Sequence, residues 1–260
     1  MKGYVLDNAA AQSPTRMRYL ACLYDANTFR HLEARGLGQG WRCLEIGGGG
    51  GSVAQWLSER VGPSGQVIVT DIDPRLLGHL RRPNVEVRVH DIALDPLEEE
   101  AFDLAHARLV LQHVPAREAA LNRIVHAVRP GGWIVVEDFE GGNLRPDPAA
   151  YRGEQPIVAY TLMREVMAEC GVDLHYGRRL PGLMRAAGLV ECEAEGRVFI
   201  HQPNSPGLRM LRANLEQLRG AILRTRRMSE AEFDADLERL ESDDILIPSP
   251  ILWTVWGRRP

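Results

Sequence analysis

Five consecutive glycines, Gly47 to Gly51, follow a short apolar run and have a carboxylate, Glu45, two residues upstream. Glycine loses more conformational freedom on folding than any other residue, so five in a row need a reason. Bare backbone lets a ligand approach closely, and such turns commonly hold a nucleotide-like ligand at the tip of the first strand of an α/β sheet. The run therefore predicts an α/β fold with a ligand at this turn.

The bulk properties limit the class of protein. The 260 residues, 45% of them hydrophobic and 25% charged, suit one large α/β domain or a core with a small cap. A net charge of -4 gives no general attraction to nucleic acid or anionic membranes. No stretch is apolar enough for a secretory signal or a membrane span. The four cysteines stand far apart, which argues against a zinc site or disulfides and favours a cytoplasmic protein.

Apolar strands alternate with helical segments along the first half of the chain, which predicts a parallel sheet with right-handed crossovers. The expected strands are 41–46, 66–70, 85–89, 101–107 and 133–137. Helices are expected over 13–36, 52–61, 74–80 and 117–128, the last broken by the turn 130–132. The second half predicts helices over 155–170 and 180–187, a strand over 192–200, two helical pieces over 205–240 parted near Ser229, and a final strand over 251–256.

The glycine run fits two ligand-binding patterns. The dinucleotide pattern G-x-G-x-x-G/A can be placed on Gly49, Gly51 and Ala54, but a single match of this kind is weak. The other register is E-x-G-x-G-x-G, formed by Glu45, Gly47, Gly49 and Gly51. In this register the sequence resembles class I S-adenosylmethionine-dependent methyltransferases, whose first motif has this form. The absence of a Tyr-x-x-x-Lys pair, in a chain whose single lysine is at position 2, also counts against a nicotinamide-dependent oxidoreductase.

The resemblance extends over residues 41–140 and the C-terminal tail. Asp71 stands where the family has an acid for the ribose hydroxyls, and Asp91 where an acid contacts the adenine amino group. The turn 129–132 matches the family's Arg-Pro-Gly-Gly turn, and 253–256 resembles its closing strand. The resemblance implies a doubly wound Rossmann-like, seven-stranded, mostly parallel sheet with an antiparallel last strand. N-terminal helices and a helical insertion between the last two strands complete the expected α/β fold.

The resemblance also implies a site for S-adenosyl-L-methionine. Backbone N–H groups of the turn suit the methionine carboxylate, and a charged acceptor such as Asp71 strengthens hydrogen bonds from the ribose hydroxyls. Simpler roles stay open: Glu45 as a strand-end acid, Asp91 as a turn residue, and Asp71 or, preferably, Asp73 as a helix cap. The expected cofactor-binding residues are Glu45, Gly47, Gly49, Gly51, Asp71, Ile72, Asp91, Ile92 and Arg108.

Methyl transfer is an in-line displacement that depends on positioning and, for some acceptors, on a nearby base. The expected catalytic residues are His113, after the fourth strand, and Glu137, at the end of the fifth. His113 can instead face a helix or solvent, and Arg108 can pair with a helix acid. Glu137 and Asp138 together can act as a base or ligate a metal, which is the arrangement that some catechol-type methyltransferases use. No second cluster of oxygen ligands follows the fourth strand, so no metal is expected.

The segments outside the core are expected to select the acceptor. Residues 1–36 are predicted to form a helical lid over a methyltransferase domain at 37–260, whose cofactor-binding core is 41–140 and whose helical cap segments are 150–171 and 205–240. Methionine and aromatic stripes at helical spacing are also consistent with simple core packing. The expected substrate-binding residues are Tyr24, His113, Asp138, Tyr160 and His201.

The overall resemblance is to small-molecule methyltransferases of bacterial secondary metabolism, which implies an aromatic or apolar acceptor and leaves the methylated atom open. An alternative is a protein of this fold that binds the donor or its product without methyl transfer, in a regulatory or cyclase-like role. Nucleic acid is not an expected partner, because the segment after the fourth strand lacks the Asn/Asp-Pro-Pro-aromatic element that grips a flipped base. A homodimer built by the helical additions is a further expectation.

Overall fold

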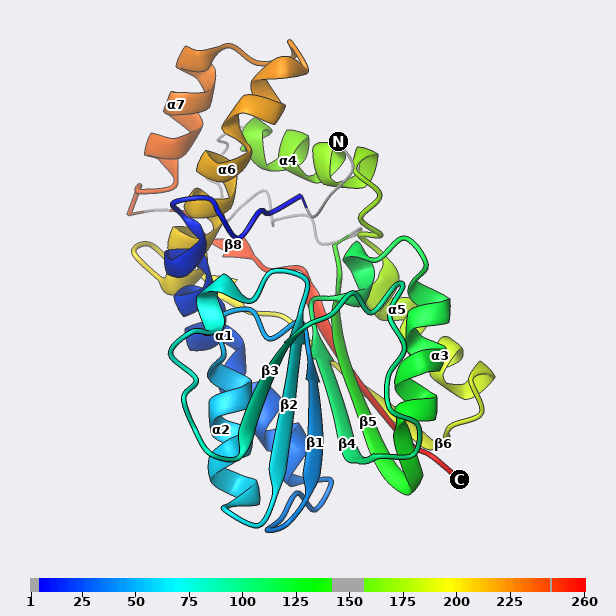
Figure 1. Cartoon of the computed structure of the whole chain (residues 1–260). Coiled ribbons are helices and arrows are strands. Elements are labelled where there is room, and N and C mark those ends of the chain that lie inside the picture. Colours follow the sequence, from blue (N-terminus) through cyan, green and yellow to red (C-terminus); the bar gives the residue numbers. More distant parts are fainter. Residues whose placement is uncertain (1–4, 142–156, 244) are drawn as a thin grey trace.

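A seven-stranded sheet forms the centre of the computed structural model, which describes residues 5–141, 157–243 and 245–260 (Figure 1). Its strands are β1 (Arg42–Ile46), β2 (Gln66–Asp71), β3 (Val85–Val89), β4 (Phe102–Arg108), β5 (Val128–Glu140), β6 (Val190–Arg197) and β9 (Ile251–Arg258). They lie in the order β3-β2-β1-β4-β5-β9-β6. The first five strands pair in parallel, and β9 runs antiparallel to both of its neighbours. The predicted sheet, including its antiparallel last strand, is confirmed.

Helices cover both faces of this sheet: α1 (Ser13–Glu33) and α2 (Ser52–Val61) lie on one face, and α3 (Arg117–Ala127) and α5 (Tyr176–Ala186) lie on the other. Three further helices, α4 (Val158–Glu169), α6 (Pro206–Arg224) and α7 (Glu230–Arg239), pack with one another. Successive side chains of a strand point to opposite faces. Accordingly Val67 and Val69 of β2 belong to the apolar cluster that includes residues of α1 and α2, whereas Ile68 belongs to the cluster on the other face, which includes residues of α3 and α5. This double burial explains why the strands read as continuous apolar runs in the sequence.

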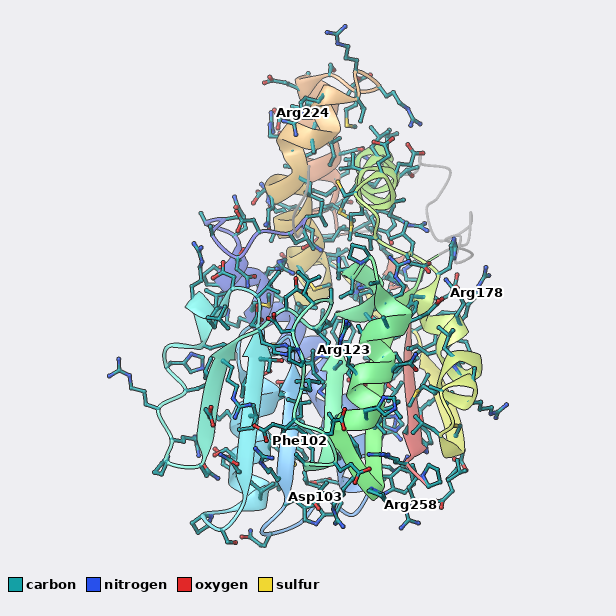
Figure 2. The ribbon with its side chains drawn as sticks, turned by 45° about the vertical axis from the view of Figure 1, so that its right-hand side comes forward. Phe102, Asp103, Arg123, Arg178, Arg224 and Arg258 are labelled. Atoms are coloured by element: carbon teal, nitrogen blue, oxygen red, sulfur yellow. The ribbon has the colours of Figure 1, made fainter. Side chains whose placement is uncertain are left out.

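A third apolar cluster joins α4, α6 and α7 beyond the carboxyl ends of the parallel strands (Figure 1). Figure 2 shows Arg224, at the end of α6, far from Asp103 and Arg258 at the opposite edge of the sheet. Helix α6 ends at Arg224, and Ser229 begins α7 by forming a capping box with Glu232. The predicted insertion between the last two strands of the sheet, in two pieces, is therefore confirmed.

Several element boundaries differ from the expectation. The segment 130–132 was expected to be a turn between a helix and a strand. It lies within β5, where the pairing with β4 is irregular. The expected helix over 74–80 is only a 3-10 turn, η1 (Pro74–Leu77). The strand expected over 192–200 is divided, because β6 ends at Arg197 and β7 (Ile200–His201) pairs with β8 (Ile247–Pro248). Residues 155 and 156 of the expected helix over 155–170 lie outside the described residues.

Helix α5 begins four residues earlier than expected, at Tyr176, and this start depends on Gly177. A Cβ atom at Gly177 would come within 2.4 Å of the carbonyl oxygen of Asp138, so only glycine lets α5 approach β5 this closely. Pro181 lies inside the helix. The close approach of backbone to backbone sets the position of α5 on the sheet.

We expect Gly177→Ala to destabilise the fold by about 1–3 kcal/mol, because the obstructing atoms are backbone and cannot rotate away. Gly182→Ala is the matched control: it lies in the same helix, nothing lies within 4 Å of its added Cβ, and it should stabilise by about 0.5–1 kcal/mol. Urea unfolding of the two variants and the parent measures both effects. Equal stabilities for the two variants would contradict this account of how α5 docks.

Candidate active site

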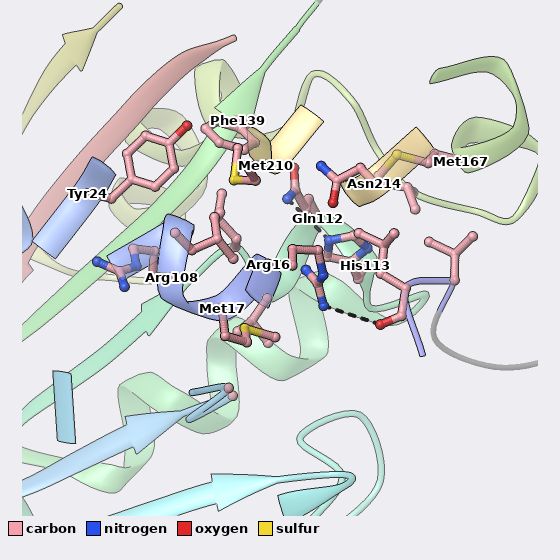
Figure 3. Close-up of a pocket in the computed structure, with 18 of the residues that line it drawn as sticks. Arg16, Met17, Tyr24, Arg108, Gln112, His113, Phe139, Met167, Met210 and Asn214 are labelled. Atoms are coloured by element: carbon pink, nitrogen blue, oxygen red, sulfur yellow. Dashed lines mark hydrogen bonds between the residues drawn. The ribbon is translucent and has the colours of Figure 1, made fainter. Parts of the chain in front are cut away.

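A cavity of about 750 Å³ lies between the carboxyl ends of the parallel strands and helices α1, α4 and α6 (Figure 3). Open α/β sheets bind ligands at this edge, and cavities of this size suit small molecules. Most of the expected site residues line it: Tyr24, Glu45, Gly47, Gly49, Asp71, Ile72, Asp91, Ile92, Arg108, His113, Tyr160 and His201. The expected site residues that do not line it are Gly51, Glu137 and Asp138.

The glycine turn follows the alternation of the E-x-G-x-G-x-G register. Gly47, Gly49 and Gly51 have φ angles of 68°, 53° and 81°, in the left-handed region that favours glycine. A Cβ at Gly47 would also lie 2.3 Å from a methyl carbon of Val110. Gly51 precedes α2 as its N-cap residue, so its part in the site is to shape the turn and not to touch the cavity.

Asp71 fixes the turn from the end of the neighbouring strand. One carboxylate oxygen accepts the N–H of Gly49 at 3.0 Å, and the other accepts the N–H of Asp73 at 2.9 Å. Burial raises the pKa of Asp71, while these backbone hydrogen bonds oppose the rise. Asp73 caps the 3-10 turn by accepting the N–H of Arg75, as the preferred simpler interpretation predicted.

The adjacent part of the cavity is an apolar slot with an acid at its edge. Ile72 is 51% exposed, although it is a large apolar residue, and Ile92 is buried nearby on the cavity wall. Asp91 accepts the N–H of Ala93 at 2.8 Å, so it stabilises its own turn as well as lining the cavity. An exposed isoleucine beside a carboxylate suits a flat ring that carries a hydrogen-bond donor.

Arg108 pairs with helix α1 as well as lining the cavity. Its guanidinium donates to the carboxylate of Asp25 and to the hydroxyl of Thr28, each at 2.8 Å. The alternative interpretation, that this arginine pairs with a helix acid, is therefore confirmed. Its positive charge is compensated on the α1 side of the cavity.

Three buried ionisable side chains connect the ends of β1, β4 and β5. The Nδ1 atom of His106 lies 2.6 Å from Glu45, and its Nε2 atom lies 3.3 Å from Glu137. Burial alone would lower the pKa of His106, but the two carboxylates outweigh it and raise the pKa to about 9. The ring is thus an imidazolium that donates from both nitrogens, one to Glu45 and one to Glu137.

The carboxylate of Glu137 is hydrogen-bonded to other residues and does not line the cavity. Its oxygens accept hydrogen bonds from Thr28, Asn27, Thr254 and His106. Burial raises the pKa of Glu137, but the hydrogen bond from His106 and nearby positive charge outweigh that effect and bring it to about 2. The carboxylate is fully occupied within the core, so we do not retain Glu137 as a candidate for catalysis.

Asp138 is also enclosed, for a reason that lies in the length of β5. The strand was expected to end at Glu137, but it continues to Glu140, so both acids lie inside it and point to opposite faces. Asp138 is fully buried, accepts the backbone N–H of Gln112 at 3.3 Å, and has a pKa that burial raises well above its usual range. We therefore do not retain Asp138 as a substrate-binding candidate.

His113 lies in a 3-10 turn, η2 (Leu111–His113), after β4 and lines the cavity. Its Nε2 atom lies 3.3 Å from the amide nitrogen of Gln112 (Figure 3). Burial, together with the charges of Arg16 and Arg117, lowers the pKa of His113 to about 3. The ring is therefore neutral at physiological pH and can accept a proton or a hydrogen bond.

Aromatic side chains form much of the remaining wall. Tyr24 makes edge-to-face contacts with Phe139 and Phe199, and its buried hydroxyl has no hydrogen-bond partner among the described residues. Burial raises the pKa of Tyr24 well above its usual range. Tyr160 contributes from α4, and His201 packs so closely on α6 that burial lowers its pKa.

Helix α1 contributes residues that the sequence analysis did not identify. Arg16, Leu20 and Tyr24 are spaced by four residues, so they share one face of the helix, and all three line the cavity. Gln112 and Asn214 also line it (Figure 3). The four-residue spacing from Tyr24 is the sequence signal that points to Arg16, whereas nothing in the sequence distinguishes Asn214.

Within residues 5–141, 157–243 and 245–260, no group of three or more His, Cys, Asp or Glu side chains is arranged to hold a metal ion. In the same ranges, no helix combines the length and apolar character needed to cross a membrane. All four cysteines are free thiols.

The imidazolium of His106 predicts a pH-dependent stability. Its pKa is about 9 in the folded chain and about 6.5 unfolded, so its contribution is full below pH 6.5 and lost as pH rises toward 9. The loss is about 3 kcal/mol. His106→Gln should remove this pH dependence and destabilise the fold by about 3–5 kcal/mol, because two buried carboxylates lose their cation. Urea unfolding at pH 6.5 and pH 9 measures both.

His126→Gln is the matched control, because His126 is exposed on α3 and its ring hydrogen-bonds only to the carbonyl of Asn122 among the described residues. It should keep the stability and the pH dependence of the parent. An unchanged pH dependence in His106→Gln would show that His106 is not the buried cation.

Comparisons with known proteins agree with this architecture. The sequence profile of a methyltransferase domain family matches residues 44–136, from the end of β1 into β5. Methyltransferase str2 from Strobilurus tenacellus is 35% identical over 158 residues, which cover 58% of this chain and 54% of that protein. The chain spans about half the length of the curated relatives it matches.

Two solved structures share the fold across most of the chain. The YcgJ protein from Bacillus subtilis has a TM-score of 0.61 at 13% identity, covering 91% of this chain and 99% of that one. The cyclase SpnF has a TM-score of 0.54 at 18% identity, covering 91% and 84%. Together with the glycine turn and the acids that follow β2 and β3, the match identifies residues 44–136 as a methyltransferase domain, and the solved structures share the fold of the chain around it.

Proposed function

We propose that this protein transfers the methyl group of S-adenosylmethionine to a small organic acceptor by in-line displacement. The observation that carries the proposal is that one cavity unites the glycine turn and Asp71 on one side with His113 and Tyr24 on the other. A donor and an acceptor bound in the same enclosed space can meet with the correct alignment. Such positioning supplies about 7–11 kcal/mol of the barrier reduction in favourable cases.

The residues of the turn suit the donor. Side chains at Gly47 or Gly49 would fill the cradle, and their absence leaves room for a ligand against the backbone. Asp71 would accept from the ribose hydroxyls, while Asp91 with Ile72 would hold the adenine ring. When bound, the cofactor supplies an electrophilic methyl group on a sulfonium.

The opposite wall suits an aromatic or largely apolar acceptor. It is formed by rings and thioethers, including Tyr24, Phe139, Tyr160 and Met210, which exclude water from the reacting groups. His113 is neutral here and would accept a proton or a hydrogen bond from the acceptor. The resemblance to methyltransferase str2 supports methyl transfer, and a role in secondary metabolism stays a prediction. A homodimer and a cytoplasmic location stay predictions.

Binding of S-adenosylhomocysteine tests the donor site. We expect this product to raise the melting temperature of the parent, because a ligand that binds only the folded state stabilises it. Asp71→Asn should lose most of that shift, because a neutral amide accepts ribose hydroxyl bonds less strongly. The control is Asp73→Asn, a neighbouring acid that does not line the cavity and should keep the shift. No shift in the parent at high ligand concentration would contradict the proposal.

A second candidate function is binding of the donor or product without methyl transfer. The likeness of the fold to the cyclase SpnF is the observation that favours it, because the same architecture carries a different named activity there. This alternative shares the donor site and differs only in turnover. The two are separated by whether any acceptor is consumed.

We expect the parent to release S-adenosylhomocysteine from S-adenosylmethionine when screened with phenols, aromatic amines and enolisable ketones. His113→Ala should lower kcat by about 10²–10⁴-fold where a proton must leave the acceptor, with a much smaller change in donor affinity. His175→Ala is the control, since His175 does not line the cavity. Donor binding without turnover on any acceptor, and no effect of His113→Ala, would favour the binding protein.

A further inference from the structure

Arg16 is a buried cation that forms no ion pair with an acid among residues 5–141, 157–243 and 245–260. It is 3% exposed, and Nη2 donates to the carbonyl oxygen of Leu6 at 3.3 Å (Figure 3). Its Nε atom is also buried and has no hydrogen-bond partner in the part of the chain that the structure describes. Removing a guanidinium from water is costly unless an anion compensates it. Arg108, in contrast, lines the same cavity with its charge compensated by Asp25.

The side chain of Arg16 points away from the donor side of the cavity, which is formed by the glycine turn. Met17, the next residue, lies against the glycine turn, where its Cβ would be 2.9 Å from a Cβ atom at Gly50. Consecutive helical residues point about 100° apart, so Arg16 is turned away from that contact. It extends instead toward Leu6, which packs in the apolar cluster of α4, α6 and α7, and toward His113 (Figure 3).

The groups around Arg16 are polar and neutral. His113 lies close enough for the charge of Arg16 to lower its pKa. Gln112 contacts His113 at 3.3 Å, and Asn214 of α6 has a buried side-chain oxygen that no described residue satisfies. These side chains offer hydrogen bonds but no negative charge. The positive charge of Arg16 is thus left for a ligand to neutralise.

We propose that Arg16 binds an acidic oxygen group of the acceptor, and that the acceptor is therefore an organic acid, most simply an aromatic carboxylate. A guanidinium presents two parallel N–H groups that match a carboxylate, which makes it the preferred side chain for this recognition. The apolar wall would hold the rest of the molecule. The inference rests on the proposed function, since it names the substrate class of the same cavity.

Binding of the acceptor would also change the base beside it. An anion on Arg16 offsets the positive charge that helps to lower the pKa of His113. His113 then becomes a stronger proton acceptor only when an acidic acceptor is in place. This coupling links recognition of the acid to removal of a proton from it.

The test uses pairs of probes that differ in charge and little in shape: benzoate with benzamide, and 4-hydroxybenzoate with 4-hydroxybenzamide. Each is titrated calorimetrically into the parent loaded with S-adenosylhomocysteine. We expect each acid to bind about 10-fold or more tightly than its amide. Arg16→Met should abolish this preference, and Arg16→Lys should reduce it, because lysine keeps the charge but lacks the planar fork.

Arg18→Met is the matched control, because Arg18 lies in the same helix, is exposed, and does not line the cavity. It removes the same charge and should keep the preference for acids. Circular dichroism and thermal unfolding verify that each variant is folded. If Arg16→Met does not fold, Arg16→Lys is used in its place. Acids that bind no better than amides to the parent, or that do not bind at millimolar concentration, would overturn the proposal.

A second comparison separates the acceptor from the donor, whose methionine end also carries a carboxylate. Affinities for S-adenosylhomocysteine and for 5′-methylthioadenosine, which lacks that end, are measured in the parent and in Arg16→Met. We expect neither affinity to change. A loss confined to S-adenosylhomocysteine would assign Arg16 to the donor and overturn the proposal. If the parent binds no S-adenosylhomocysteine, the proposed function fails, and titration of the acids into the protein alone still decides the inference.

Discussion

The rest of the site depends on the buried contact of one imidazolium with two carboxylates. His106 of β4 lies between Glu45 of β1 and Glu137 of β5, so the contact holds the three central strands together at their carboxyl ends. Thr28 of α1 donates to Glu137 from the other side. The same contact thus fixes where α1 lies on the sheet, and the glycine turn begins two residues after Glu45. A buried charge cluster of this kind persists only when each member is compensated.

The cavity follows from this arrangement, because α1 and the glycine turn form two of its walls. Its polar groups are divided. Asp71 and Asp91 lie on the side of β2 and β3, whereas His113 and Arg16 lie toward the cap helices. An apolar interior strengthens the electrostatic effect of each of these groups, since water screens them poorly there. The division gives the two substrates of a transfer reaction chemically different binding surfaces within one space.

The family resemblance correctly implied the seven-stranded, mostly parallel sheet with its antiparallel last strand, and local pattern predicted the cap at Asp73. The prediction from sequence was wrong where contacts between distant segments of the chain determine the structure. Glu137 and Asp138 were expected at a strand end, but pairing of β5 with β9 extends the strand to Glu140 and encloses both acids. The role of His106 depends on the register that places it opposite Glu45, which no local pattern reveals. Arg16 was missed because basic residues on helices are usually solvated.

The most direct test of the account is a crystal structure of the protein with S-adenosylhomocysteine. The account predicts the ribose oxygens within hydrogen-bonding distance of the carboxylate of Asp71, the adenine beside Asp91, and the sulfur facing the part of the cavity that contains His113. S-adenosylhomocysteine bound outside this cavity, or bound in it with the ribose away from Asp71, would contradict the account.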